Sequence, residues 1–238
     1  MHESMDDHTR ERIMAGNDEH AEHNREHFDE AGTFVVNIMS APGAGKTSLL
    51  EASIGLLGDR IKLRVVEGDM VGELDAERLR KHGTVVDQIC TGRNCHLDAL
   101  MISRLLHADH FSKSDLLFIE NVGNLVCPAE FNLGEHKKVV LLSVTEGDDK
   151  PVKYPVIFRG CDAVVITKCD LLPYVNFNTE TAIGHIKALN PDAKIFCLSA
   201  TKPEDTNCIS SWIEWLQTEL EQYQQNFRGN QNVPVGAG

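Results

Sequence analysis

TFVVNIMSAPGAGKTSLL, residues 33–50, has the composition of a buried strand, a turn of small residues and the first turns of a helix. Its opening run is mostly apolar and partly β-branched, as in parallel strands that are covered on both faces. The segment SAPGAGKT then matches the phosphate-binding pattern G-x-x-x-x-G-K-[ST], with Ser40 in the place of the first glycine. A strand before this motif and a helical apolar pattern after it are the context that the motif requires. The stretch therefore predicts a nucleoside triphosphate site.

The motif supplies three kinds of phosphate ligand. Its backbone N–H groups would surround the β-phosphate, the Lys46 ammonium would reach the β and γ oxygens, and the Thr47 hydroxyl would bind a magnesium ion at the helix N-terminus. The alternative is an ordinary glycine-rich turn that happens to contain Gly-Lys-Thr. The residues expected to bind the phosphates are Gly43, Ala44, Gly45, Lys46, Thr47 and Ser48.

Length, charge and cysteine usage limit the classes of function. The chain has 238 residues, 42% of them hydrophobic, which is enough for one α/β core, and it has no apolar run long enough to cross a bilayer. Its formal charge of −13 argues against a nucleic-acid partner, because phosphate backbones need clustered Lys and Arg. The seven cysteines form no C-x-x-C pair, and the N-terminus lacks the organisation of a secretory signal. We expect a cytoplasmic protein with no membrane or nucleic-acid partner.

The two ends of the chain have the composition of disordered tails. Residues 1–32 are acidic and rich in histidine with almost no apolar periodicity, and residues 226–238 are polar and contain glycine. The globular domain is expected to span residues 33–225. If the first tail becomes helical, three of its histidines share one face and could chelate a metal ion, whereas the alternative is a solvated acidic leader. These histidines are His20, His23 and His27.

Acidic residues follow two of the expected strands at their carboxyl ends, where open α/β sheets bind ligands. Asp69 follows a strand expected at residues 61–67, and we predict that it faces magnesium. Glu120 ends a strand expected at residues 115–120 and would hold magnesium or orient water. Asp75 would position water or cap the following helix. The predicted catalytic residues are Lys46, Asp69, Asp75 and Glu120, and the predicted magnesium ligands are Thr47, Asp69 and Glu120.

Hydrolysis at this site is expected to be slow. No glutamine follows Glu120 in the position that orients water in fast switches, and no arginine is obviously placed near the phosphates. Without an arginine finger, intrinsic rates are on the order of 10⁻⁴ to 10⁻³ per second, so the bound nucleotide would act as a timer.

The segment TKCD, residues 167–170, resembles the guanine-reading N-K-x-D loop with Thr167 in the asparagine position. Asp170 would accept two hydrogen bonds from the N1–H and the exocyclic amine of guanine, while the stem of Lys168 would cover the base. Such a segment alone could be an ordinary strand-to-helix turn, but its position after a phosphate loop and an acidic strand favours a base pocket. The residues expected to complete the pocket are Ser199 and Ala200.

Two cysteines and a histidine stand out beyond the nucleotide motifs. Cys95 and His96 lie just before an expected helix, and Cys127 comes seven residues after Glu120. Gly123 would let the intervening loop pass close to the γ-phosphate, so Cys127 is tethered to the segment that senses the nucleotide. The alternative is a buried packing cysteine beside a surface histidine.

Expected strands alternate with expected helices throughout residues 33–225. Successive strand and helix units of this kind form parallel sheets with helices on both faces. We therefore predict the α/β class, with a three-layer, doubly wound and mostly parallel sheet and the P-loop NTPase fold.

Seven motifs together resemble the HypB family of hydrogenase-maturation, nickel-insertion GTPases: SAPGAGKT, EGDMVGELDAER, TGRNCHLDA, FIENVGNLVCP, SVTEGDDKPVKYP, TKCD and LSAT. The resemblance covers residues 33–225 and implies a metallochaperone of the signal-recognition-particle-like class that uses GTP and Mg²⁺ and forms a GTP-favoured homodimer. It implies that Cys95, His96 and Cys127 bind Ni²⁺ or Zn²⁺. The implied partners are a small zinc-containing hydrogenase accessory protein and the hydrogenase large subunit. Some relatives add an N-terminal Cys-x-x-Cys-Gly-Cys nickel site, which this sequence lacks.

Three other interpretations stay open at this point. A urease-maturation nickel GTPase has a contiguous Cys-Pro-His motif, whereas here Pro128 is followed by Ala129. A nucleotide-dependent metabolic kinase would have no metal role and would use Cys95 and Cys127 only for packing. A metal-storage protein built on an inactive GTPase fold is disfavoured, because the phosphate and base motifs are intact.

Overall fold

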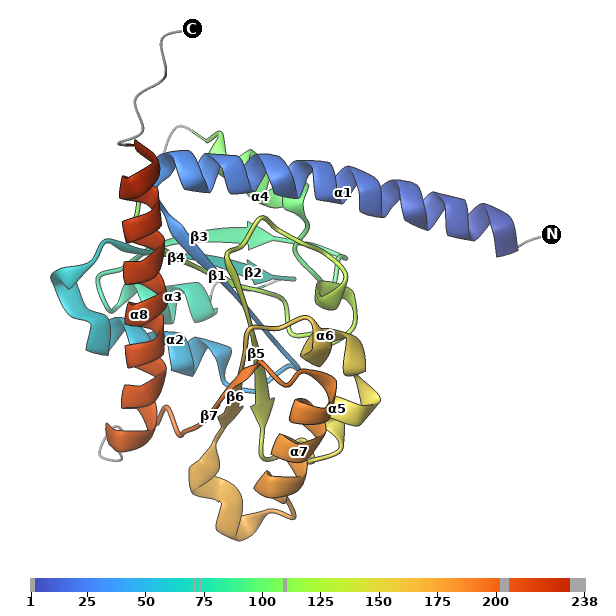
Figure 1. Ribbon diagram of the computed structural model, residues 1–238, viewed down its shortest axis with the longest axis vertical. Helices are drawn as coiled ribbons and strands as arrows, with labels where there is room; N and C mark the ends of the chain where they lie inside the picture. Colours follow the sequence, from blue (N-terminus) through green and yellow to red (C-terminus); the bar gives the residue numbers. More distant parts are fainter. Residues whose placement is uncertain (1–2, 71, 73, 109–110, 202–205, 232–238) are drawn as a thin grey trace, which may run out of the picture.

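The computed structural model describes residues 3–70, 72, 74–108, 111–201 and 206–231. Its centre is a seven-stranded sheet in the order β3-β2-β4-β1-β5-β6-β7, and every described strand pair is parallel (Figure 1). The predicted α/β class and doubly wound arrangement are confirmed. We expected a mostly parallel sheet, and all of the described strand pairs are parallel. The strands are β1 Phe34–Ser40, β2 Leu63–Asp69, β3 Val85–Cys90, β4 Leu116–Glu120, β5 Lys137–Ser143, β6 Ala163–Thr167 and β7 Lys194–Cys197.

Helices cover both faces of the sheet and make the three layers. On one face the core joins the sheet to α2 (Lys46–Leu57), α3 (Leu74–Arg80) and α8 (Thr206–Gln231). On the other face it joins the sheet to α1 (Glu3–Ala31), α4 (Ala99–Leu106), α6 (Pro155–Arg159) and α7 (Thr179–Leu189). The short α5 (Lys150–Lys153) precedes α6, and 3-10 turns occupy Gly58–Arg60, Cys127–Ala129 and Cys169–Tyr174.

Strand β1 lies in the middle of the sheet, with all seven of its residues buried. Because side chains alternate along a strand, Phe34 and Ile38 enter the core under α2 and α8, whereas Val35 and Met39 enter the cores on the opposite face. Burial of each such side chain contributes about 1.5–3 kcal/mol. The strand ends at Ser40, so its packing places the phosphate motif at the centre of the sheet's carboxyl edge.

We expected residues 1–32 to be disordered or marginally helical, and in the part that the structure describes, Glu3–Ala31 forms one long helix, α1. Figure 1 shows it crossing the molecule above α4, with its N-terminal end projecting beyond the body. The buried positions of α1 are Asn17, Ala21, Asn24 and Phe28, spaced about one turn apart. Two of these four side chains are asparagines, so the stripe shows no apolar periodicity and cannot be found by a hydrophobic pattern.

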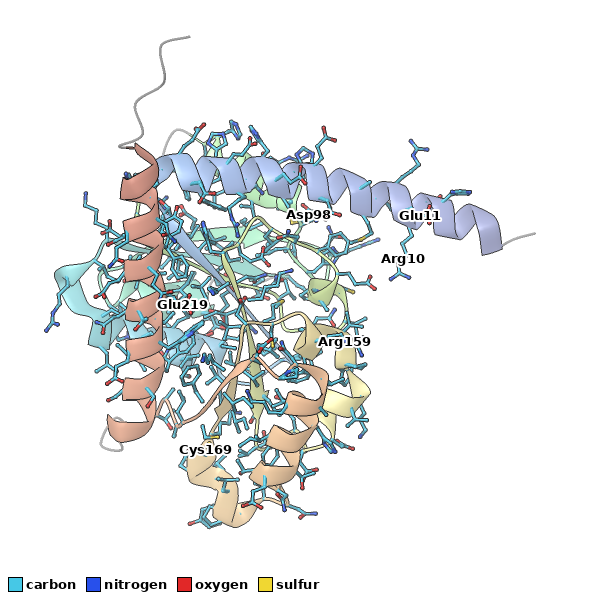
Figure 2. All side chains as sticks on the ribbon, in the orientation of Figure 1. Arg10, Glu11, Asp98, Arg159, Cys169 and Glu219 are labelled. Atoms are coloured by element: carbon cyan, nitrogen blue, oxygen red, sulfur yellow. The ribbon has the colours of Figure 1, made fainter. Side chains whose placement is uncertain are left out.

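Hydrogen bonds replace apolar contacts along this stripe. Asn24 Nδ2 donates to the carbonyl oxygens of Ala99 and Leu133 at 2.8 and 3.1 Å, and the Asn17 carboxamide accepts the Ala99 N–H at 2.9 Å. Gly134 lets the backbones meet, since a Cβ there would lie 2.7 Å from the carbonyl oxygen of Ala21. Helix α1 is thereby fixed to the start of α4. Closer to its N-terminus, Arg10, which is labelled in Figure 2, pairs with Glu130.

The C-terminal helix is also longer than expected. We predicted a tail from residue 226, but α8 continues to Gln231, and residues 232–238 lie outside the described part of the chain. Trp212 anchors α8, because its ring is buried and its Nε1 donates to Ser53 Oγ at 2.9 Å. Among the described helices, none combines the length and the apolar character needed to cross a membrane.

Candidate nucleotide and metal sites

The phosphate loop joins β1 to α2, and two glycines shape it. Gly43 and Gly45 have φ values of 73° and 100°, which other residues rarely adopt, and an added Cβ at either would meet no atom within 4 Å. Glycine is therefore needed here for backbone conformation and not for space. A loop of this kind at the start of a helix presents backbone N–H groups to an anion.

Ser40 occupies the first position of the motif, where the pattern has glycine, and it is fully buried. Lys46 Nζ donates to Ser40 Oγ at 3.3 Å, and the same hydroxyl donates to the carbonyl oxygen of Ala41 at 2.6 Å. The serine thus holds the lysine ammonium over the loop. The departure from the pattern leaves the phosphate end of the loop intact.

Two buried glutamates lie side by side behind the phosphate loop. Glu67 on β2 is the register partner of Glu120 on β4, and Thr47 Oγ1 donates to Glu120 Oε1 at 2.8 Å. Each glutamate keeps one buried carboxylate oxygen, Oε2, without a hydrogen-bond partner among the described residues. Unpartnered buried oxygens next to a threonine hydroxyl are a ligand set that suits Mg²⁺, a hard cation that prefers oxygen.

The pKa values of both glutamates are raised. Burial, together with the negative charges of Glu120, Asp69 and Asp75, raises the pKa of Glu67 to about 8. Burial raises the pKa of Glu120 to about 7, although Lys46 and the Thr47 hydrogen bond oppose this. Two adjacent carboxyl groups of this kind need a cation to be charged together, which again fits magnesium.

The two aspartates that we expected in this site have other partners in the structure. Asp69 accepts hydrogen bonds from the N–H groups of Met70 and Gly72, at 2.6 and 3.1 Å, and so shapes its own loop. Asp75 accepts a hydrogen bond from Arg78 Nη1 at 3.0 Å. The structure thus brings Glu120 to Thr47, whereas the aspartates make no hydrogen bond to either residue in the described chain. Their negative charges still act on this site, since both aspartates raise the pKa of Glu67 and Asp75 also raises the pKa of Glu120.

Sequence reasoning assigned no role at this site to two charged residues, although it counted Glu67 among the acidic residues near the triphosphate. Glu67 could have been found as a carboxylate inside the buried strand sequence IKLRVVE. Arg78 Nη2 lies 3.4 Å from Ser48 Oγ and 2.5 Å from Glu51 Oε2, although we expected no arginine near the phosphates. Nothing in the local sequence distinguishes it from the other helical arginine, Arg80.

The segment TKCD supports the phosphate loop from the side. Thr167 Oγ1 donates to the carbonyl oxygen of Ala44 at 2.6 Å, and Lys168 Nζ donates to that of Gly43 at 2.6 Å. Lys168 has φ 59° and is the one non-glycine residue with positive φ in the described chain. A left-handed conformation is unfavourable for a non-glycine residue and is enriched at functional turns. Cys169 of the same segment is labelled in Figure 2 at the end of the molecule away from α1.

Asp170 faces the second loop of the predicted base pocket. Ser199 Oγ donates to Asp170 Oδ1 at 2.6 Å, and Thr201 Oγ1 lies 3.3 Å from the same serine hydroxyl. Ala200, between them, is partly buried against the core. One carboxylate oxygen of Asp170 is therefore oriented by the protein.

Cys95, His96 and Cys127 come together in one half-buried cluster. Their donor atoms all lie within 4.8 Å of one another, with the two sulfur atoms 3.1 Å apart and Cys95 Sγ 3.9 Å from His96 Nδ1. The backbone at residues 95 and 96 is neither helix nor strand, which lets adjacent side chains reach one point. Burial lowers the pKa of His96, although Asp98 opposes this, and a lower pKa favours the neutral imidazole that binds metal. The predicted convergence of these residues is seen in the structure.

The thiol cluster and the phosphate loop share one connecting segment, residues 121–126. Gly123 packs so closely on the phosphate loop that a Cβ would lie 2.9 Å from Pro42 Cα. Asn124 Nδ2 donates to the carbonyl oxygen of Cys95 at 3.3 Å, and Asn121 Oδ1 accepts the N–H of Leu97 at 3.1 Å. A movement of this segment would therefore change the geometry of both the phosphate loop and the thiol cluster.

A phosphate loop after the central strand and an acidic strand beside it define the class of P-loop nucleoside triphosphatases. A family model for the "CobW/HypB/UreG, nucleotide-binding domain" matches residues 34–197. A hydrogenase maturation factor HypB from Azotobacter vinelandii is 46% identical over 87% of this chain and 67% of its own length. A Helicobacter pylori relative described as hydrogenase/urease maturation factor HypB is 43% identical over 90% of this chain and 88% of its own.

Solved structures agree with these relatives. The structure of HypB from Archaeoglobus fulgidus has a TM-score of 0.79 and 45% identity, over 87% of this chain and 99% of that chain. That of HypB from Helicobacter pylori in complex with nickel has a TM-score of 0.79 and 42% identity, over 89% and 97%. FtsY from Mycoplasma mycoides, at 13% identity and a TM-score of 0.51, shares the fold alone. The chain belongs to the HypB family of hydrogenase maturation factors, as its motifs predicted.

Proposed function

We propose that this chain is a GTP-hydrolysing metallochaperone that assists nickel insertion into [NiFe] hydrogenase. The observation that carries the proposal is the cluster of Cys95, His96 and Cys127 on a segment that also packs against the phosphate loop. A metabolic kinase has no use for a convergent thiol and imidazole set beside its nucleotide. Family membership and the nickel complex of the Helicobacter pylori relative support the same conclusion.

Each nucleotide contact has a proposed residue. Lys46 and the backbone of the phosphate loop bind the phosphates, and Asp170 selects guanine while Ser199 orients it. Thr47 and Glu120 hold Mg²⁺, which neutralises phosphate charge when bound, and the neighbouring Glu67 joins them. Asp69 and Asp75 reach the site only if the loop between them moves, and Asp75 would then position water.

Hydrolysis should remain slow in spite of Arg78. This arginine is already bonded to Glu51 and Asp75, so it would have to leave both carboxylates to reach a γ-phosphate. Intrinsic turnover on the order of 10⁻⁴ to 10⁻³ per second fits a site without an available arginine finger.

The metal cluster is proposed to close across a dimer. Three donors leave the coordination shell of Zn²⁺ or Ni²⁺ open, and a second copy related by a twofold axis supplies the missing ligands. Because Gly123 touches Pro42, contacts of the γ-phosphate with this region would reposition Cys127. GTP should therefore favour the dimer and change metal affinity, and metal should change dimerisation by the same free energy.

The cellular setting follows from this role. We propose that residues 33–225 are the GTPase domain, that the protein acts in the cytoplasm, and that it binds a small zinc-containing accessory protein and the hydrogenase large subunit. The acidic charge of −13 suits proteins and metal ions as partners and not nucleic acid.

Sedimentation and metal analysis test the proposal. Wild type, Cys127→Ala and the control Cys90→Ala, an exposed cysteine outside the cluster, are run with GDP or a GTP analogue and with Ni²⁺ or Zn²⁺. We expect a GTP- and metal-favoured dimer in wild type and Cys90→Ala, and a reduced metal stoichiometry in Cys127→Ala. A wild type that stays monomeric under every combination contradicts the shared site. GTP turnover that survives in Lys46→Ala contradicts the assigned nucleotide site.

A further inference from the structure

Three histidines from two helices meet where α1 lies over α4 (Figure 1). His23 and His27 are on α1, and His107 follows the last residue of α4. Their ligand atoms all lie within 4.8 Å of one another. His20, which the sequence places on the same face of α1, is not in this group, and His107 takes its place.

The ring geometry is suited to a shared ion. Ring centroids are 4.9 Å apart for His23 and His27, 5.0 Å for His27 and His107, and 5.9 Å for His23 and His107. A tetrahedral ion with metal–nitrogen bonds of about 2.0–2.1 Å separates its ligands by about 3.4 Å. The three imidazoles therefore need to approach by no more than about 1.4 Å. Because His23 and His107 are exposed and His27 is half-buried, rotation of the side chains can supply this movement.

A hydrogen bond to the backbone prepares the ligand atom of His107. His107 Nδ1 lies 2.7 Å from the carbonyl oxygen of Ser103. A carbonyl only accepts, so this nitrogen carries the proton and Nε2 keeps its lone pair, as in metal-binding histidines whose other nitrogen is bonded to a carbonyl. His23 Nδ1 lies 3.9 Å from a carboxylate oxygen of Glu26, which is an electrostatic contact and not a hydrogen bond.

The charge around the cluster favours a cation. The carboxylate of Glu26 contributes negative charge, and His107 stands at the C-terminus of α4, where the helix dipole is negative. The helices are also held in register without a metal, because Asn17 and Asn24 bind both the N–H and the carbonyl of Ala99. The histidines are thus presented by two elements whose relative position is already set.

We propose that His23, His27 and His107 form a second metal site, which binds one borderline divalent cation of the Ni²⁺ or Zn²⁺ type through imidazole nitrogens and clamps α1 to α4. Three imidazoles are a ligand set for such ions and not for Mg²⁺ or Ca²⁺. The site shares no residue with the nucleotide pocket or with the thiol cluster. Asp98, labelled beneath α1 in Figure 2, caps the other end of α4 just after Cys95 and His96, so this short helix runs from one metal cluster to the other.

Titration of the full chain with Ni²⁺ tests this site by itself. The parent protein carries Cys95→Ala and Cys127→Ala, which remove the thiol cluster, and calorimetry is done without nucleotide. We expect one Ni²⁺ per chain, weakened by more than about tenfold in His107→Ala and in His23→Ala, because loss of even an outer-shell partner costs about 10–100-fold in affinity. His20→Ala, on the same helix but outside the cluster, is the matched control and should bind as the parent does.

X-ray absorption of the parent complex should show imidazole ligation, and Ni²⁺ should raise the Tm of the parent but not of His107→Ala.

Two outcomes overturn the proposal. Ni²⁺ affinity that is the same in the parent and in His107→Ala removes α4 from the site, and an equal loss in His20→Ala shows that the histidines of α1 bind as a loose chelating string. His107→Asn, whose amide nitrogen takes the place of Nδ1 and can donate to Ser103, separates lost ligation from lost folding, with the circular dichroism spectrum as the check. The histidine variants should bind GTP as the parent does, so failure of the histidine site is distinguishable from failure of the proposed function.

Discussion

His136 lies between α1 and the sheet, and its protonation should set the pH dependence of stability. Its Nδ1 accepts the N–H of Val35 at 3.0 Å, so Nε2 carries the proton and donates to Asp29 Oδ1 at 2.9 Å. A second proton would have to displace the Val35 hydrogen bond. Burial lowers the pKa of His136 to about 4, with help from the nearby Arg25 and Lys137, while Asp29 opposes the shift.

The sign and size of the effect follow from linkage. Between pH 6.5, the ordinary histidine pKa, and pH 4 the unfolded chain binds a proton that the folded chain does not, so stability falls as pH falls. The contribution is fully present above about pH 6.5 and is lost progressively toward pH 4. With the pKa of about 4 for His136, the free energy of unfolding should drop by about 2 kcal/mol between pH 7 and pH 5 through this residue alone.

Urea unfolding of wild type and His136→Asn, followed by the fluorescence of the two tryptophans of α8, measures this contribution. Glu67 and Glu120 have raised pKa values and change stability in the opposite direction, so the informative quantity is the difference between the two proteins. The variant should be less stable at pH 7, but the gap should close by about 2 kcal/mol at pH 5. Parallel pH profiles would mean that His136 already titrates near its ordinary pKa and that the buried neutral imidazole is a wrong assignment.

Three further changes test other parts of the structure. Asp170→Asn should weaken GTP binding by roughly a hundredfold and improve binding of xanthosine triphosphate, because charge-assisted hydrogen bonds contribute about 1.5–3 kcal/mol each; unchanged GTP affinity removes this carboxylate from the base pocket. Gly123→Ala should push on Pro42 and weaken nucleotide binding by about 1–3 kcal/mol in calorimetry, and normal affinity would show that the contact yields easily. Asn24→Ala should lower the free energy of unfolding by about 1–3 kcal/mol, since two buried carbonyl oxygens lose their donor, whereas the exposed Asp18→Ala should change it by less than about 0.5 kcal/mol.

The central part of the fold was predictable because its signals are local. The apolar run of β1, the glycines of the phosphate loop and the carboxylate that ends β4 each follow from residues adjacent in sequence. The convergence of Cys127 on Cys95 was also expected, but from motif resemblance, since no local rule joins residues so far apart.

The parts that were missed depend on contacts between distant segments. Helix α1 is held by asparagines that bind backbone groups of α4 and of residues 132 and 133, and such partners leave no periodic signal in the sequence. Glu67 and Arg78 acquire their places near the phosphate loop only when β2 is paired with β4 and when α3 packs against α2. Tertiary neighbours, not local propensity, decide these positions.

The order of the sheet has a consequence for synthesis of the protein. In the described sheet, strand β1 pairs with β4 and β5, which are synthesised later. The register partner of Phe34 is Leu116, about 80 residues further along the chain, and that of Val36 is Lys137. At 5–20 residues per second a ribosome takes roughly 4 to 16 s to make the first of these partners. During this interval a strand whose seven residues are all buried in the folded protein has no partner on either edge, and contacts so distant in sequence also form slowly after release. The nascent chain should therefore depend on chaperones until β4 and β5 have emerged, and ribosome profiling of chaperone-bound nascent chains should show binding that begins after β1 is exposed and ends after β5.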